Sequence, residues 1–201
     1  MRWILFVLAL AGTSYALGHL FDSPPQAEAG TAVRMDVEDL VDAADRIVEA
    51  RITGRRTLPD GRGGIVSEYQ LDVHRTFLGS EQAPQTIRIP GGVLANGRGL
   101  MLPGMPRLSV GEEVLLFLNG QTDCMPTGLA QGKFRIMTDR SGLRRAMRAS
   151  SQLELVQANG QTAGHAGVQS LAYAELSARI QAQVVDRHAR EASASISSEG
   201  R

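Results

Sequence analysis

Cysteine is almost absent from this chain of 201 residues, which has one, Cys124. No disulfide can form within the chain, so its stability must come from a hydrophobic core rather than from cross-links. An unpaired cysteine in an exported protein is either buried and inert or paired with another chain. We expect Cys124 to be buried or simply inert, and no second cysteine or clustered histidines accompany it to suggest a catalytic role.

The chain also has no excess of charge of either sign and few aromatic side chains. The 21 basic and 21 acidic residues give a formal net charge of zero. No global field therefore attracts the protein to nucleic acid or to an anionic membrane. Aromatic residues make up 4% of the chain, which leaves few rings for stacking against sugars. We expect no nucleic-acid partner.

The common catalytic motifs are missing. The four histidines lack the i, i+4 spacing of a helical zinc site, and neither a Gly-x-Ser-x-Gly elbow nor a Gly-x-x-x-x-Gly-Lys-Ser/Thr phosphate loop occurs. The sequence therefore predicts a protein that is not an enzyme, with no catalytic residues, no metal site and no cofactor. A small carboxylate-dependent hydrolase stays open as the alternative, because Asp and Glu side chains from distant strands can meet in one site.

What the sequence does contain begins with a signal-peptide pattern. Met1-Arg2 is a positive end, and residues 3–12 are an apolar run. Ser14-Tyr15-Ala16 offers small residues to a signal peptidase, and Ala16-Leu17-Gly18 is a second possible cleavage frame. The run is shorter than the roughly 20 residues of a membrane span, and an uncleaved anchor is the competing interpretation. We expect a signal peptide over 1–18, no membrane span after its cleavage, and an exported protein, periplasmic or extracellular.

The next segments predict a leader and a β-rich domain. Proline and small residues favour a flexible leader over 19–35. The domain, 36–150, opens with a short helix over 36–44 that Asp36 can cap. Apolar patterns then predict strands over 48–52, 65–77, 86–89, 114–118, 132–137 and 143–147. A glycine-rich turn predicts that the first two form a hairpin, and the unbroken apolar run 114–118 indicates a central strand covered on both faces.

The C-terminal part of the chain predicts a linker, a helix and a tail. Residues 151–167 are rich in Gly, Ala, Gln and Asn and are expected to be a linker. Residues 168–192 predict a helix whose Leu176, Ile180 and Val184 form an apolar stripe, suited to packing on its own domain or on a partner. Residues 193–201 are expected to be a disordered tail. The fold class is mainly β with flanking helices.

One long loop, 91–111, stands out as the predicted binding surface. It carries six glycines and two prolines together with apolar side chains, and loops of this length inside a compact domain are usually functional or disordered. The apolar residues either cap the end of the β-domain or form an exposed binding tip. The residues that we predict to bind a partner are Gly91, Gly92, Leu100, Met101, Leu102 and Met105.

Three stretches resemble netrin-like domains, the group that includes the tissue inhibitors of metalloproteinases. Residues 44–52 are similar to the opening strand of that family, residues 69–79 to its long strand ending in a Leu-basic-Gly element, and residues 111–118 to its Gly-x-x-apolar-Leu-Leu-Phe strand. The resemblance covers roughly residues 40–120. Residues 128–134, Gly-Leu-Ala-Gln-Gly-Lys-Phe, also resemble a segment of small exported bacterial proteins.

The resemblance implies an OB-like, five-stranded antiparallel β-barrel over the domain. It also suggests a secreted protein, such as a metalloprotease, as the partner of an exported binding or accessory module. The inhibitors of that family act through an N-terminal cysteine held by disulfides, and this chain has no cysteine near either predicted mature N-terminus. The resemblance therefore carries over a scaffold and not that mechanism.

Overall fold

The computed structural model describes residues 30–80, 85–120, 124–149, 153–157, 159, 161–165 and 168–199. The predicted signal peptide and residues 19–29 of the predicted leader lie outside this part. The elements in chain order are β1 (Gly30–Val33), α1 (Val37–Ala43), β2 (Arg46–Pro59), β3 (Ile65–Leu78), β4 (Thr86–Pro90), β5 (Gly92–Val93), β6 (Gly99–Leu100), β7 (Glu113–Asn119), β8 (Met125–Pro126), a 3-10 turn (Leu129–Gly132), β9 (Lys133–Thr138), β10 (Arg144–Ala149), β11 (Leu153–Val156), β12 (Thr162–His165), β13 (Val168–Ala172) and α2 (Tyr173–Glu199).

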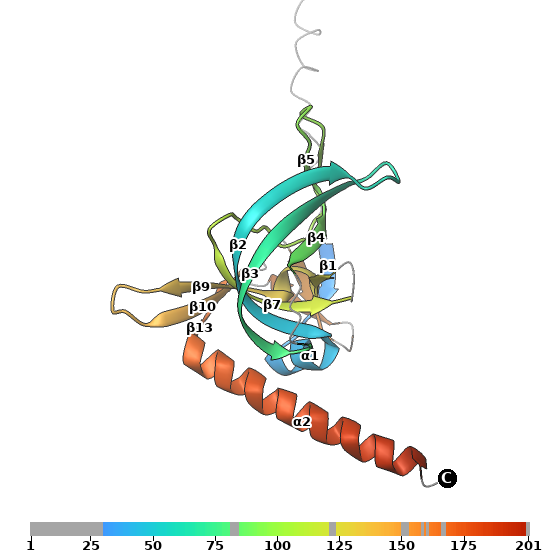
Figure 1. Cartoon of the computed structure of the whole chain (residues 1–201), viewed down its shortest axis with the longest axis vertical. Helices are drawn as coiled ribbons and strands as arrows, with labels where there is room; N and C mark the ends of the chain where they lie inside the picture. Colours follow the sequence, from blue (N-terminus) through green and yellow to red (C-terminus); the bar gives the residue numbers. More distant parts are fainter. Residues whose placement is uncertain are drawn as a thin grey trace, which may run out of the picture.

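Strands β2 and β3, of 14 residues each, form a long hairpin, and Figure 1 shows both strands curling along their length. Asp60 makes the turn, because its Oδ1 accepts hydrogen bonds from the backbone N–H of Arg62 and of Gly64, both at 2.8 Å. Three register shifts interrupt the pairing of the two strands. Bulges of this kind bend a strand and increase its twist, which accounts for the curl. The predicted hairpin is confirmed.

Strand β7 is the centre of the largest sheet, whose order is β13-β10-β9-β7-β2-β3-β4, with β8 also paired to β7. All residues from Val114 to Leu118 are fully buried, as the unbroken apolar run predicted. Leu115 and Phe117 pack in one cluster together with α1 and α2. Val114, Leu116 and Leu118 pack in a second cluster enclosed by the curled hairpin and β4. One strand thus joins two cores.

Both helices cover the same face of this sheet (Figure 1). Asp36 caps α1 as predicted: its side chain accepts a hydrogen bond from the N–H of Asp39 at 2.9 Å, and the Asp39 carboxylate accepts one from the N–H of Asp36 at 3.0 Å. The stripe Leu176, Ile180 and Val184 of α2 is buried in the first cluster. The C-terminal helix therefore packs on its own domain.

Arginine side chains fix α2 against α1. Arg187 donates hydrogen bonds to the carbonyl oxygens of Val41, at 2.9 Å, and of Ala44, at 2.6 Å, and so satisfies carbonyl groups at the C-terminal end of α1. Arg179 pairs with Glu38 in a bidentate contact at 2.7 and 3.0 Å. None of the helices in the described part of the chain is both long and apolar enough to span a membrane.

The strand pairing differs from the expected closed barrel. The sheets are antiparallel apart from the β1–β11 pair, and the largest sheet, among the described strands, is open between β13 and β4. One backbone hydrogen bond, from Arg88 N–H to the Cys124 carbonyl at 3.0 Å, reaches from β4 to the residue before β8. Cys124 itself is buried, as expected, and its thiol donates to the Gly120 carbonyl oxygen at 3.0 Å.

The leader and linker predictions need correction, because parts of both are strands. Within 19–35, β1 pairs in parallel with β11, and within 151–167, β11 and β12 pair antiparallel. The side chain of Gln131 explains why the leader is held: its Oε1 accepts a hydrogen bond from the Met35 N–H at 2.9 Å, and its Nε2 donates to the Val33 carbonyl at 2.9 Å. Residues 30–35 and the strands β11 and β12 are thus held by contacts with residues far away in the sequence.

The prediction for the last helix also needs correction at both ends. Residues 168–172, expected to be helical, form β13 and pair with β10. The helix runs instead from Tyr173 to Glu199, through most of the tail predicted to be disordered over 193–201. Once a helix is nucleated, each added residue gains a hydrogen bond, so a small polar sequence can continue a helix that packing has already started.

Candidate functional site

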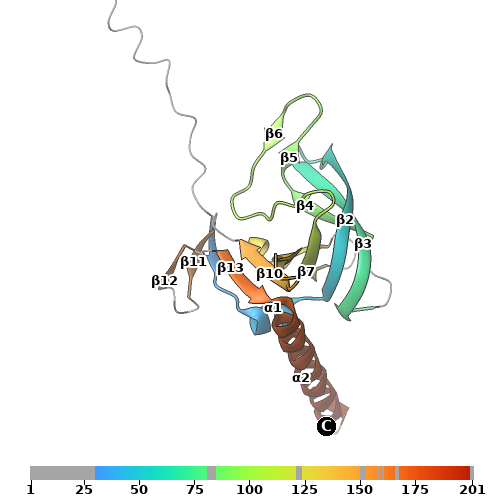
Figure 2. The same cartoon turned by 90° about the vertical axis from the view of Figure 1, so that its left-hand side faces the viewer.

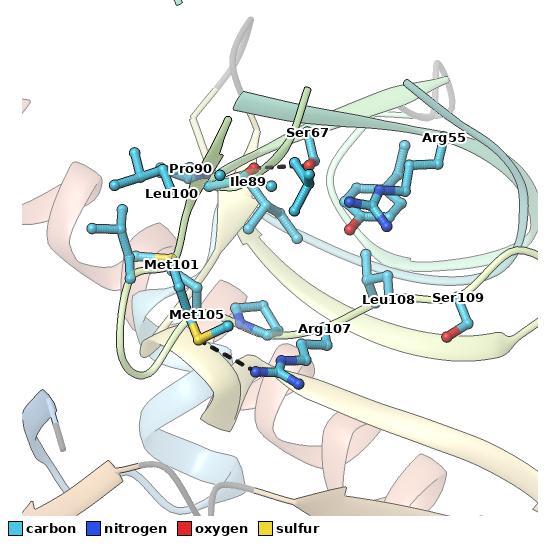
Figure 3. Close-up of a pocket in the computed structure, with 17 residues that line it drawn as sticks. Arg55, Ser67, Ile89, Pro90, Leu100, Met101, Met105, Arg107, Leu108 and Ser109 are labelled. Atoms are coloured by element: carbon cyan, nitrogen blue, oxygen red, sulfur yellow. Dashed lines mark hydrogen bonds between the residues drawn. The ribbon is translucent and has the colours of Figure 1, made fainter. Parts of the chain in front are cut away.

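The loop after β4 folds over one end of the curled hairpin and leaves a pocket of about 520 Å³, which we call the loop pocket. Its walls come from β2, β3 and β4 and from the loop between Gly91 and Ser109 (Figure 3). All six residues predicted to bind a partner line it: Gly91, Gly92, Leu100, Met101, Leu102 and Met105. The structure therefore brings the predicted site residues together in one place.

The loop is anchored at several points. The Gly91 N–H donates to the Ile65 carbonyl at 2.7 Å, and the Ser67 hydroxyl donates to the Gly91 carbonyl at 2.8 Å. Gly92 has φ +135°, and a Cβ there would overlap the Ser67 hydroxyl and lie 2.8 Å from a Thr57 carbon. Only glycine fits this close approach of β5 to the hairpin. The short β5–β6 ladder then holds the outer part of the loop.

The two interpretations of the loop, as a core cap and as an exposed tip, apply to different residues. Leu108 is 5% exposed and belongs to the second core cluster, against which Met105 also packs. Leu100 is 36% exposed and Met101 is 66% exposed. The inner residues of the loop close the end of the core, and the outer ones leave an apolar rim open to solvent.

Several lining residues were not predicted from the sequence, chiefly Arg55, Ser67, Tyr69 and Arg107. The first three lie on the hairpin, more than 20 residues before the loop. Ser67 and Tyr69 fall in a predicted strand, whereas Arg55 lies beyond the end of the predicted strand 48–52. Figure 3 shows Arg55 and Ser67 on the hairpin side of the pocket, with Met101, Met105 and Arg107 on the loop. The guanidinium of Arg107 donates to the Met101 sulfur at 3.5 Å.

A second hollow of about 410 Å³ adjoins the loop pocket, and residues of the 105–109 segment line both. Met137, Met147 and Val168 contribute apolar surface to it. Three of its charged groups are already paired, because Lys133 contacts Glu112 at 2.6 Å and the Glu112 carboxylate also lies 3.7 Å from Arg135. The 105–109 segment thus borders two hollows, the loop pocket and a second one that contains the paired charges of Glu112, Lys133 and Arg135.

Two carboxylates that are buried in the described part of the chain lie outside the loop pocket, and one of them, Glu68, is 5% exposed and pairs with Arg56 and Arg88. Glu49 of β2 is 6% exposed and accepts hydrogen bonds from Tyr173 and Arg144. Burial raises the pKa of Glu49, but these hydrogen bonds and the Arg144 charge outweigh it and hold that pKa below its ordinary value. Burial and the hydrogen bond to Glu49 raise the pKa of Tyr173. This cluster fastens α2 to the sheet.

Metal coordination has no basis in the described residues, where no three His, Cys, Asp or Glu side chains are placed to hold one ion. The chemistry that the loop pocket offers is adhesion to an apolar group, with arginines at its edge. Comparison with protein-family models finds no match for the chain, and no curated protein is similar to it. The assignment of function therefore depends on the geometry of the site.

Proposed function

We propose that this protein is an exported, non-enzymatic binding or accessory module of the cell envelope or medium, and that the loop pocket is its binding site. The observation that carries the proposal is the apolar rim, where Leu100 and Met101 stand exposed on a loop whose inner residues are fixed in the core. Methionine and leucine side chains adapt to the shape of a partner. A rigid base beneath them limits the entropy lost on binding.

The partner in this proposal is a secreted protein, and the resemblance to netrin-like domains favours a metalloprotease.

An OB-like scaffold is part of the same proposal. The curled β2–β3 hairpin and the backbone bond from Arg88 to Cys124 support it, because together they bring β4 next to the segment that leads into β8. The predicted signal peptide supports export.

The proposal predicts that the double variant Leu100→Ser/Met101→Ser loses its partner without losing its fold. Both side chains are largely outside the core, so the free energy of unfolding should change by less than about 1 kcal/mol. Affinity capture from the envelope and medium of the source, quantified by mass spectrometry and followed by a binding assay with the purified partner, should show at least a roughly tenfold loss.

The matched control is Leu143→Ser/Val185→Ser, which removes two apolar side chains that are 61% and 66% exposed outside the pocket. This control should capture the same partner as the unchanged protein. If Leu100→Ser/Met101→Ser destabilises the domain and leaves every interaction intact, the loop is only a core cap and the proposed function is wrong.

A further inference from the structure

One polar group in the loop pocket makes no hydrogen bond within the described part of the protein. Tyr69 is 5% exposed and packs in the second core cluster, and it lines the pocket. Its hydroxyl makes no hydrogen bond to any of the described residues, whereas the neighbouring Ser67 hydroxyl is committed to the Gly91 carbonyl. No buried side-chain oxygen of the described residues lacks a partner, so this hydroxyl is open to the pocket although the ring is buried. It is free to bond to water or to a ligand there.

Two cations lie with this hydroxyl on the pocket wall. The Arg55 guanidinium sits over the Tyr69 ring, 5.8 Å from its centre, and Arg107 projects from the loop. Within the described part of the chain neither arginine forms an ion pair, and the residues that line the pocket include no carboxylate. The side-chain hydrogen bond that Arg55 makes within the described residues is a long one, to the Thr57 hydroxyl at 3.5 Å. The wall is therefore cationic, and its complement is an anion.

The rest of the wall is hydrocarbon and thioether. Its apolar side chains are Ile89, Pro90, Val93, Leu100, Met101, Leu102, Met105, Pro106 and Leu108. Apart from Ser67, Tyr69, Ser109 and the two arginines, no side chain in the lining can hydrogen-bond. A peptide inserted into the pocket would bring more amide groups than these few polar side chains could bond, and unsatisfied buried amides are costly, so the protein partner contacts the rim and not the interior. An alkyl chain carries no such groups.

We propose that the loop pocket binds an acyl carboxylate, that is, an unbranched hydrocarbon chain ending in one carboxylate group. The carboxylate accepts hydrogen bonds from the Arg55 guanidinium and the Tyr69 hydroxyl, and the chain lies along Met105, Met101 and Leu100. Arg107 adds positive charge at the loop side. The inference rests on the proposed function in that it names what enters the same pocket, beneath the rim that contacts the protein partner.

The probe that tests this is sodium decanoate, titrated into the purified full chain by isothermal calorimetry below the concentration at which it forms micelles. Decan-1-ol, with the same chain and no charge, should bind about tenfold more weakly, because a charge-assisted hydrogen bond contributes about a factor of ten. Acetate, which has the charge and no chain, should show no binding. Decyltrimethylammonium, with the opposite charge, should bind at least as weakly as decan-1-ol.

Substitutions then locate the carboxylate. Arg55→Gln should weaken decanoate about tenfold, Tyr69→Phe should weaken it several-fold, and neither should change binding of decan-1-ol by more than about twofold. Arg62→Gln is the matched control, since Arg62 is an exposed arginine in the β2–β3 turn outside the pocket, and it should bind as the unchanged protein does. Thermal unfolding of each variant shows that it is folded.

The inference is overturned if decanoate does not bind, if decanoate and decan-1-ol bind equally, or if a folded Arg55→Gln binds decanoate normally. Its failure is separable from that of the proposed function. A protein partner that is lost in Leu100→Ser/Met101→Ser and kept in Arg55→Gln, with no decanoate binding, leaves a protein-binding module without an acyl site. Absence of both the partner and decanoate binding rejects both.

Discussion

At the scale of single residues, glycines decide where backbones of this protein can touch. Gly132, at the end of the 3-10 turn before β9, packs so closely that a Cβ there would overlap the Thr127 carbonyl oxygen and lie 3.0 Å from the Thr127 nitrogen. Both of these are backbone atoms, which cannot swing aside as a flexible side chain can. The contact sets the path of the chain from β8 into β9.

We therefore expect Gly132→Ala to lower the free energy of unfolding by roughly 2–3 kcal/mol, as overpacking against fixed atoms does. Gly99→Ala is its control, because the nearest atom to a Cβ there is 3.4 Å away and belongs to a side chain. That variant should lose less than about 1 kcal/mol. Urea unfolding followed by circular dichroism measures both, and equal losses would refute the steric explanation.

The sequence predicted the loop part of the site because the loop is long and glycine-rich and four of its residues are of types unusual for a loop. Apolar side chains at 100, 101, 102 and 105 among glycines had no role in a solvated segment. Arg55 and Tyr69 gave no such signal, since an exposed arginine and an inward-facing tyrosine are ordinary in a half-buried strand. Their convergence on the loop depends on the curl of the hairpin, which arises from bulges that local alternation does not reveal.

At the scale of elements, one buried ionic cluster joins three of them. Glu49 of β2 binds Arg144 of β10 and the first residue of α2, Tyr173, over whose ring the Arg144 guanidinium lies at 4.0 Å. The strands were predicted from alternation and α2 from its apolar stripe. Strands β1, β11, β12 and β13 were missed, because they are short and depend on partners distant in sequence.

This cluster predicts a loss of stability in acid. The pKa of Glu49 in the folded protein lies below its ordinary value of 4.5, because hydrogen bonds from Tyr173 and Arg144 outweigh the opposing effect of burial. The unfolded chain thus takes up this proton first as pH falls. The contribution of Glu49 is complete above about pH 4.5 and is lost as pH falls through the lowered folded pKa.

Denaturant unfolding from pH 7 to pH 2 checks this. Glu49→Gln should be less stable than the unchanged protein by roughly 2 kcal/mol at pH 7, because Arg144 loses its buried partner, and the difference should shrink toward pH 2. The difference between the two curves isolates Glu49 from other carboxylates that also titrate in this range. Parallel curves would show that Glu49 does not titrate with folding.

At the scale of the whole molecule, β7 places neighbouring side chains in two different cores. Leu115 belongs to the cluster beneath the helices and Leu116 to the cluster inside the hairpin. Leu153 belongs to a third and smaller cluster between the three-stranded sheet of β1, β11 and β12 and the 3-10 turn. We infer that the first two cores unfold together and that the third opens separately.

Hydrogen exchange on three alanine variants tests this division. Leu115→Ala and Leu116→Ala should each lower the free energy of unfolding by roughly 3 kcal/mol and speed exchange throughout the eight-stranded sheet. Leu153→Ala should speed exchange in β1, β11 and β12 and leave the slowest amides of β2 and β7 unchanged. A uniform response to Leu153→Ala would mean that the molecule is one cooperative unit.

The long last helix has a practical consequence. Toward its C-terminal end, α2 contacts α1 through the ion pair of Arg190 with Asp42 at 2.7 Å, and residues 191–199 continue for about 13 Å more. Figure 1 shows α2 at the opposite end of the molecule from β5, which borders the loop pocket. A biotin or fluorophore attached in the last turns of α2 would stand far from the loop pocket, so protein tethered to a sensor surface in this way would keep its pocket toward the solution.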